Sequence, residues 1–168
     1  SLLSSSIKKN KINDKIDDIF IYNLGEDIDE SIFKNVHVFI HCAYDFNVFK
    51  WNEIYEQNVL GSKKIFISAK NSGVKHTIFI SSISAFDGCI SMYGNAKLQM
   101  ESHALELGFK VLRPGVLFGN SSQGLIGRLR AIAVNAPIIP LVGRGRQELY
   151  TIHIDDLIFF IFLILDNI

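Results

Sequence analysis

The sequence predicts an α/β fold built on a doubly wound parallel sheet. Short runs of β-branched and aromatic residues alternate along the chain with longer segments of helical periodicity. The short runs are apolar on both faces, which is typical of parallel strands covered on both sides. Regular strand–helix alternation favours a right-handed, doubly wound topology.

The elements are expected in a simple order along the chain. Residues 1–18 are rich in Ser, Lys, Asn and Asp and predict a polar lead-in. Strands are predicted at 19–22, 36–41, 76–81 and 110–113. Helices are predicted from Trp51 to about Gly73, at 91–107 and at 123–135. The run "LIFFIFLIL" at 157–165 predicts a buried helix, because nine apolar residues are too few to cross a bilayer, which needs about 20.

Composition and charge exclude several classes of protein. Apolar residues make up 48% of the chain and charged residues 20%, which is typical of a globular domain. The formal net charge is zero, so no basic face for nucleic acid is expected. No signal peptide or membrane-spanning run is recognisable, and we expect a cytoplasmic protein without a membrane partner. Cys42 and Cys89 have no metal-ligand spacing, so we expect reduced thiols and no metal site.

Tyr93 and Lys97 form the most informative pair in the sequence. They are four residues apart on the predicted helix 91–107, so both side chains lie on one helix face. A neighbouring ammonium lowers the pKa of a phenol from its usual value of about 10. Ser82, at the end of the preceding strand, would hold a substrate oxygen against the phenol. The set suits proton transfer to or from an alcohol oxygen while hydride moves at the carbon. A solvated helix face with a half-buried tyrosine is the structural alternative.

Five collinear segments resemble the extended short-chain dehydrogenase/reductases, the NAD(P)-dependent epimerase/dehydratase family. "FISSISAF" with "YGNAKLQME" resembles the serine strand and Tyr-x-x-x-Lys helix of that family, and "VFIHCAY" its His-x-Ala-Ala strand end. "NVLGSKKIF" resembles its Asn-Val-x-Gly-Thr helix, "VLRPGVLFG" its Arg-Pro-x-x-Val-x-Gly segment, and "GRGRQELYTIHIDDL" its Gly-x-Gly-x-Gln…His-Val-Asp-Asp-Leu segment. The resemblance implies a partial NAD(P)-binding, Rossmann-like domain over residues 19–168, of which 137–168 lead into the substrate region.

The resemblance also implies the catalytic roles. Tyr93 matches the general acid/base, and Lys97 the residue that lowers its pKa and holds the cofactor ribose. Ser82 matches the substrate-orienting hydroxyl, with Ser81 as the competing serine. Asn58 matches the helix asparagine that supports the lysine through backbone and water, and a polar residue on a helix flank is its alternative.

The cofactor, NAD or NADP, is expected to lie along the strand ends. The residues that would line it are His41, Cys42, Ala43, Ser81, Tyr93, Lys97, Pro114, Gly115 and Val116. His41 is alternatively a structural histidine at a strand end. Pro114, Gly115 and Val116 match the segment beside the nicotinamide.

The phosphate-binding part of the family pattern does not occur in this sequence. None of the twelve glycines forms the Gly-x-x-Gly-x-x-Gly turn that meets a pyrophosphate at a helix N-terminus. We therefore expect the first strand–helix–strand unit upstream of Ser1, with 19–22 as the third strand of the fold. The residue that selects NAD or NADP belongs to that unit. Asn23 stands where the family often has an acidic residue near the adenine.

The substrate segment departs from the pattern as well. Leu149 occupies the position of the arginine that grips the diphosphate of a nucleotide sugar. Arg144 or Arg146 would replace it, or both are solvated loop residues. His153 matches a strand end, and Asp155 with Asp156 matches a helix N-cap, rather than catalysts.

These observations imply an NAD(P)-dependent epimerase/dehydratase-type oxidoreductase. Its small-molecule substrate would be a sugar-like secondary alcohol, with nucleotide sugars among the candidates. Epimerase, dehydratase and reductase activities stay open, as does a homodimer for the full-length protein. The alternative is a non-catalytic, cofactor-binding scaffold of the same fold, and the residues 1–168 by themselves are expected to be inactive.

Overall fold

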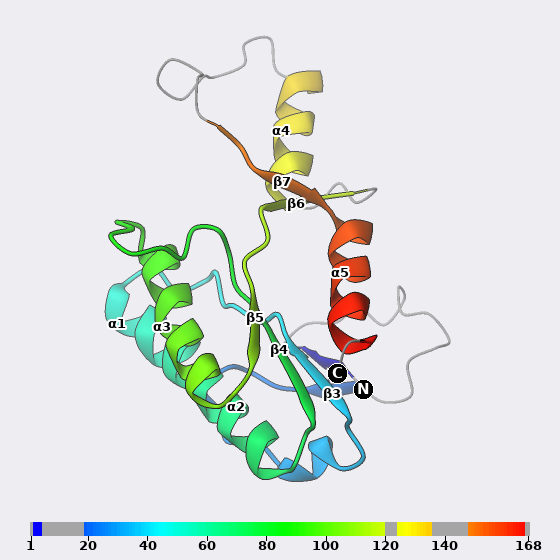
Figure 1. Cartoon of the computed structure of the whole chain (residues 1–168). Coiled ribbons are helices and arrows are strands. Elements are labelled where there is room, and N and C mark those ends of the chain that lie inside the picture. Colours follow the sequence, from blue (N-terminus) through cyan, green and yellow to red (C-terminus); the bar gives the residue numbers. More distant parts are fainter. Residues whose placement is uncertain (1, 5–18, 120–123, 136–147, 167–168) are drawn as a thin grey trace. The chain divides into compact units, whose positions relative to one another are not determined.

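The computed structural model describes residues 2–4, 19–119, 124–135 and 148–166 (Figure 1). The chain divides into two compact units, Ser1–Leu112 and Arg113–Ile168, and each is described by itself. The fold is α/β with parallel strands, as the sequence predicts.

The first unit holds two parallel sheets. In one of them, β4 (His76–Ile80) lies between β3 (Val38–His41) and β5 (Lys110–Leu112). In the other, β1 (Leu2–Ser4) pairs with β2 (Ile19–Ile21). Four of these strands lie inside the predicted runs. Leu2–Ser4, within the stretch 1–18 that was expected as a polar lead-in, form a strand, and residues 5–18 lie outside the described part.

The helices of this unit cover one face of the β3–β4–β5 sheet (Figure 1). One continuous helical segment consists of α1 (Trp51–Ile54), a π-helical stretch η3 (Tyr55–Leu60) and α2 (Gly61–Asn71). It ends as predicted next to Gly73, whose φ of 76° favours glycine. A short 3₁₀ turn, η2 (Glu30–Phe33), precedes β3.

The following helix, α3 (Met92–Glu106), confirms the prediction at 91–107. Its N-cap is Ser91, whose hydroxyl accepts a hydrogen bond from the Gly94 N–H at 3.0 Å. Gly108 follows the helix with a φ of 82°. The cap and the glycine fix both ends of α3, and with them the position of Tyr93 in its first turn.

An aromatic core joins the helices to the sheet. Its fully buried members Phe66 and Phe79 have ring centroids 5.4 Å apart, and Phe109 lies 4.8 Å from Phe66. Burial of one such side chain contributes roughly 1.5–3 kcal/mol. This core holds β4, and therefore the strand end that carries the two serines, against α2.

The second unit contains a parallel strand pair and two helices. β6 (Val116–Phe118) pairs with β7 (Thr151–His153), and α4 (Gly124–Asn135) confirms the helix predicted at 123–135. His153 ends its strand as predicted, whereas Asp155 and Asp156 lie inside the first turn of α5 (Ile154–Asp166) rather than at its N-cap.

The apolar helix at the end of this unit is present but is not buried as predicted. Leu157 is buried, whereas six apolar residues of α5 stay exposed, namely Ile154, Ile158, Phe159, Phe160, Phe162 and Leu163. The helix is apolar on all sides, and within its own unit β7 contacts only part of its surface. Within the described ranges, no helix combines the length and the apolar character needed to cross a membrane.

Candidate active site

The candidate site lies at the carboxyl ends of β3 and β4. Because these neighbouring strands are parallel, the segments that follow them leave the sheet at the same edge. The segment after β3 contains "CAYDF", and the segment after β4 contains Ser81 and Ser82 and leads into α3. This arrangement brings together residues that are about 50 positions apart in the sequence.

Ser82 and Tyr93 are in contact at this edge. A hydrogen bond with the Ser82 side chain lowers the pKa of Tyr93, but partial burial of the phenol outweighs it, so that the pKa is raised overall. The Ser82 hydroxyl also accepts a hydrogen bond from the Ser84 N–H at 3.1 Å. Ser81, in contrast, is buried, and its hydroxyl has no hydrogen-bond partner within the described part of the chain. Of the two competing serines, Ser82 is the one that the structure places against the tyrosine.

Lys97 lies one turn after Tyr93 and is buried, with 3% of its surface exposed. Its ammonium donates a hydrogen bond to the Ile80 carbonyl at 3.0 Å and lies 4.8 Å from the ring centroid of Phe79. Burial lowers the pKa of Lys97 to about 8, although the charges of Cys42 and Glu101 act in the opposite direction.

The expected effect of Lys97 on Tyr93 is not found in this structure. The pKa of Tyr93 is raised rather than lowered, and its causes are burial and Ser82. The physical reason is the direction of the lysine side chain, since Nζ is held at the end of β4 by the Ile80 carbonyl.

Asn58 is fully buried on the π-helical stretch η3. Its Oδ1 accepts a hydrogen bond from the Asp45 N–H at 2.6 Å, and its Nδ2 donates one to the Asp45 carbonyl at 3.1 Å. The prediction that Asn58 supports the lysine through backbone and water differs from this arrangement, in which Asn58 holds the backbone of the loop after β3. A π-helical stretch is unusual in soluble proteins and is frequent at functional sites.

Two aromatic residues of that loop belong to the site and were not predicted. The Tyr44 ring lies 4.9 Å from the Tyr93 ring in an edge-to-face arrangement, and Phe46 is stacked on Tyr93 at 5.8 Å. Tyr44 and Phe46 are themselves 4.8 Å apart. The available signal was their position, because "YDF" follows directly on the strand end that faces the serine segment.

The residues at the end of β3 differ in exposure. Cys42 and Ala43 are exposed and line a cavity, as a cofactor-facing turn requires. His41 is buried between Phe66 and Phe79, at 4.9 Å and 5.6 Å, and burial lowers its pKa to about 3, so that the ring is neutral. Neither of its ring nitrogens has a hydrogen-bond partner among the residues that the structure describes. This favours the structural role for His41.

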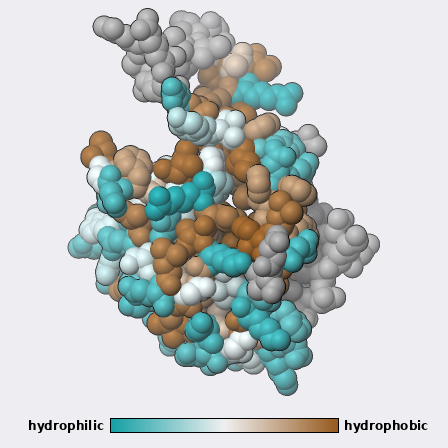
Figure 2. All heavy atoms as spheres, viewed as in Figure 1, coloured by the Kyte–Doolittle hydropathy of each residue, from teal (hydrophilic) through white to brown (hydrophobic). Residues whose placement is uncertain are grey.

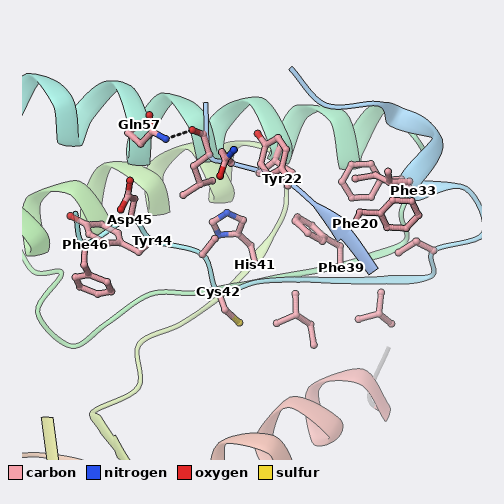
Figure 3. Close-up of a pocket in the computed structure, with 18 of the residues that line it drawn as sticks. Phe20, Tyr22, Phe33, Phe39, His41, Cys42, Tyr44, Asp45, Phe46 and Gln57 are labelled. Carbon is pink, nitrogen blue, oxygen red and sulfur yellow. Dashed lines mark hydrogen bonds between the residues drawn. The ribbon is translucent and has the colours of Figure 1, made fainter. Parts of the chain in front are cut away.

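The cavity, of about 860 Å³, extends between β2 and β3 (Figure 3). Phe20 and Phe33 lie toward one end in Figure 3, Tyr44 and Phe46 lie toward the other, and His41 lies between them. Its walls are largely apolar, and no strand among the described residues pairs with β3 on this side.

The residues present fit part of a dinucleotide. Apolar walls and the exposed Cys42 and Ala43 suit a flat ring and its ribose, and the buried nitrogens of His41 leave a polar group without a partner in the wall. Asn23, at the other wall, forms a hydrogen bond from Nδ2 to the Glu26 carboxylate at 3.0 Å. The sequence contains no glycine-rich turn that would hold a pyrophosphate.

The remaining predicted residues belong to the second unit. Pro114 and Gly115 lead into β6, and the Val116 N–H donates a hydrogen bond to the Tyr150 carbonyl at 2.8 Å. Leu149 is exposed. Arg144 and Arg146 lie outside the described residues.

Apolar side chains surround the candidate site. Figure 2 shows brown, apolar patches between hydrophilic ones on the face in view. The exposed large apolar residues of the loops after β3 and β4 are Phe46, Phe49, Ile83, Phe86 and Ile90. Single exposed apolar residues are ordinary, but several on neighbouring loops are typical of a surface that binds a ligand or another part of the protein.

Comparisons with known proteins agree with this geometry. The family model for the NAD dependent epimerase/dehydratase family matches residues 10–168. No curated protein matches the chain.

Solved structures with the same fold include three sugar-nucleotide enzymes. The UDP-glucuronic acid 4-epimerase from Bacillus cereus, in complex with NAD, has a TM-score of 0.80 at 16% identity over 98% of this chain and 64% of that one. MoeE5 in complex with UDP-glucuronic acid and NAD has a TM-score of 0.74 at 22% identity over 86% of this chain and 57% of that one. TunA, an NAD-dependent NDP-hexosamine 5,6-dehydratase, has a TM-score of 0.72 at 16% identity over 88% and 56%.

The likeness to these structures shows the fold, and the chain spans between 56% and 64% of their length. The family model covers nearly the whole chain, including every candidate site residue. The chain therefore belongs to the NAD dependent epimerase/dehydratase family.

Proposed function

We propose that the full-length protein is an NAD-dependent epimerase/dehydratase-type oxidoreductase that acts on a sugar-like secondary alcohol. The observation that carries this proposal is the contact between Ser82 and Tyr93 at the carboxyl edge of the sheet, with Lys97 one turn further along α3. The family of the chain and the NAD-bound neighbours support NAD as the cofactor.

NAD, when bound, supplies the hydride acceptor and donor of this chemistry. The chain's own residues orient the substrate oxygen and transfer the proton. The Ser82 hydroxyl, which lies close enough to Tyr93 to lower the pKa of its phenol, orients that oxygen toward the phenol. The phenol gives a proton to the oxygen when a carbonyl is reduced, and it takes one when an alcohol is oxidised.

The raised pKa of Tyr93 bears on the direction in which it acts. A phenol whose pKa lies above 10 is protonated at neutral pH, and this is the form that donates a proton to a developing alkoxide. We therefore expect Tyr93 to act as an acid in this state, and the reverse role requires a nearby positive charge that lowers this pKa. Lys97, the basic residue nearest in the helix, is directed to the Ile80 carbonyl here.

The substrate class is drawn from the neighbours and from the site. MoeE5 was solved in complex with UDP-glucose, and the Bacillus cereus protein is a UDP-glucuronic acid 4-epimerase. UDP-glucose and UDP-glucuronic acid are therefore suitable first probes. Leu149 contributes no charge at the position where the family pattern has its diphosphate-gripping arginine, so we expect a weak grip on the diphosphate.

The test uses the full-length protein, purified with and without Tyr93→Phe. We expect the substitution to lower turnover of a converted UDP-sugar by about 10²- to 10⁴-fold, the usual contribution of a general acid or base. NAD affinity, measured by calorimetry, should change by less than about threefold because the ring is kept. Tyr55→Phe, a half-buried tyrosine of η3 that packs on Trp51, is the matched control.

Two results would overturn the proposal. Unchanged turnover in Tyr93→Phe would remove Tyr93 as the acid/base. A wild-type protein that binds NAD but converts neither probe, and no other sugar-like alcohol offered, would instead establish the scaffold alternative.

A further inference from the structure

The Tyr44 ring contacts both members of the Tyr93–Lys97 pair. Its centroid lies 4.9 Å from that of Tyr93 and 5.5 Å from the Lys97 ammonium. The first contact is edge-to-face, at 73°, which is a favoured arrangement of two aromatic rings. The second is a cation–π contact within the usual range of about 6 Å. One side chain from the β3 loop therefore touches two side chains on successive turns of α3.

The backbone that carries Tyr44 is held in place. Asn58 hydrogen-bonds both the N–H and the carbonyl of the next residue, Asp45. The Asp45 carboxylate in turn accepts hydrogen bonds from the N–H and the Nδ2 of Asn47, at 2.8 and 2.9 Å, which closes the loop on itself. These bonds hold the backbone on the C-terminal side of Tyr44, and β3 holds it on the N-terminal side. The backbone position from which the Tyr44 side chain projects is therefore fixed.

Phe46 completes the enclosure of the Tyr93 ring. It stacks on Tyr93 at an interplanar angle of 24°, while Tyr44 meets the same ring at 73°. Two rings at different angles restrict rotation of the phenol about χ1 and χ2 more than either ring does by itself. Phe46 is mostly exposed, whereas Tyr44 is about half-buried.

We propose that Tyr44 is a positioning residue: its ring fixes the orientation of the Tyr93 phenol and covers the Lys97 ammonium. This inference rests on the proposed function for the part that concerns turnover. Its other part, the cover over Lys97, is a property of the folded protein and is testable without substrate. Tyr44 itself would touch no reacting atom.

A ring that packs only for stability is the competing explanation. Such a ring would lower the stability of the protein when removed but would leave the accessibility of Lys97 and the pH dependence of turnover unchanged. The positioning role predicts a different result, because the aromatic face of Tyr44 contacts Tyr93 and Lys97 whereas its hydroxyl is not needed for either contact.

The experiment compares Tyr44→Phe, Tyr44→Leu and the matched control Tyr55→Leu in the full-length protein. The first readout is the rate of reductive methylation at Lys97 with formaldehyde and cyanoborohydride, followed by peptide mass spectrometry. Lys97 is 3% exposed in the structure and should react slowly. We expect Tyr44→Leu to raise the rate severalfold, and Tyr44→Phe and Tyr55→Leu to leave it unchanged.

The second readout is the pH profile of turnover. Tyr44→Leu should lower kcat on the order of 10- to 100-fold, the effect of a small misplacement of a reacting group. The limb that reports Tyr93 should move to lower pH, because water admitted beside the phenol relieves the burial that raises its pKa. Tyr44→Phe should keep the wild-type kcat and the wild-type pH profile, since it keeps the ring.

Unchanged Lys97 methylation in Tyr44→Leu, or a Tyr44→Phe variant as impaired as Tyr44→Leu, would overturn the inference. If Tyr44→Leu does not fold, Tyr44→Met, which fills more of the volume, takes its place with the same expected outcomes. Failure of the proposed function is recognised separately, by unchanged turnover in Tyr93→Phe, and it leaves the methylation result valid.

Discussion

The Asn58 carboxamide forms two hydrogen bonds with the Asp45 peptide, one with its N–H at 2.6 Å and one with its carbonyl at 3.1 Å. Both groups of a side-chain amide are thus used on one residue of a loop that lacks regular structure. The pair connects the π-helical stretch of the long helical segment to the loop that carries Tyr44 and Phe46. A buried amide in this position orders the aromatic side of the candidate site.

Replacement of Asn58 by alanine should therefore destabilise the protein. The Asp45 N–H and carbonyl lose their partner in a part-buried place, which costs about 1–3 kcal/mol for an unsatisfied group. Urea unfolding measures the difference in free energy of unfolding. Asn52→Ala, on the exposed side of α1, is the matched control and should change stability by less than about 0.5 kcal/mol. Equal effects of the two substitutions would contradict the assigned role of Asn58.

His41 should make the protein sensitive to acid. Burial lowers its pKa to about 3, so the native state holds a neutral ring where the unfolded chain binds a proton below about pH 6.5. The unfolded state then binds more protons between pH 6.5 and 3, and stability falls as the pH is lowered through this window. The loss reaches on the order of several kcal/mol when complete.

The measurement is urea unfolding from pH 7 to 4 for the wild type and for His41→Phe. The variant keeps an aromatic ring beside Phe66 and Phe79 but carries no titrating group. Its stability should fall less steeply than that of the wild type, because carboxylates common to both proteins contribute equally. Parallel profiles would show that His41 does not stay neutral in the native state.

The strands and helices that were correctly predicted carry local signals. β3, β4 and α2 consist of apolar runs whose period matches their structure, and Ser91 and Gly108 mark the ends of α3. The strands β1 and β6 were not predicted, whereas β2 and β5, which also have three residues each, lie in the predicted apolar runs 19–22 and 110–113. The contact of Ser82 with Tyr93 was predictable because Ser82 directly follows a predicted strand and Tyr93 begins the next predicted helix.

The rest of the site depends on distant contacts. Lys97 turns to the Ile80 carbonyl because that group is available at the end of β4, and a spacing of four residues contains no such information. Asn58 reaches Asp45 across 13 positions, and Tyr44 reaches Tyr93 of α3 from the loop after β3. Side chains of this kind have several possible partners at the level of sequence, and only the packing of the helices on the sheet selects one.

Gly94, directly after Tyr93, permits close packing of α3 on the preceding loop. A Cβ at this position would collide with the Ser84 carbonyl, and it would lie 2.8 Å from the Ser91 hydroxyl that caps the helix. Gly94→Ala should therefore lower the free energy of unfolding by about 1–3 kcal/mol, although alanine favours a helix more than glycine does. Ser102→Ala, at an exposed position of the same helix, is the control. A stabilised Gly94→Ala protein would show that the loop moves away without cost.

Lys97 should make stability rise with pH on the alkaline side. Burial lowers its pKa to about 8, whereas in the unfolded chain the ammonium keeps its proton to about pH 10.4. Between these values the unfolded state binds more protons than the native state, so that stability increases with pH across this window, by on the order of 3 kcal/mol. Below pH 8 both states are charged and the full cost of burying the ammonium is present.

Lys97→Met removes the titrating group, and its stability relative to the wild type should therefore decline from pH 7.5 to 10.5 in urea unfolding. Lys70→Met, which replaces an exposed lysine of α2, should follow the wild-type profile. If the Lys97→Met and wild-type curves stay parallel, the ammonium is better solvated in the native protein than its burial beneath Phe79 and Tyr44 implies.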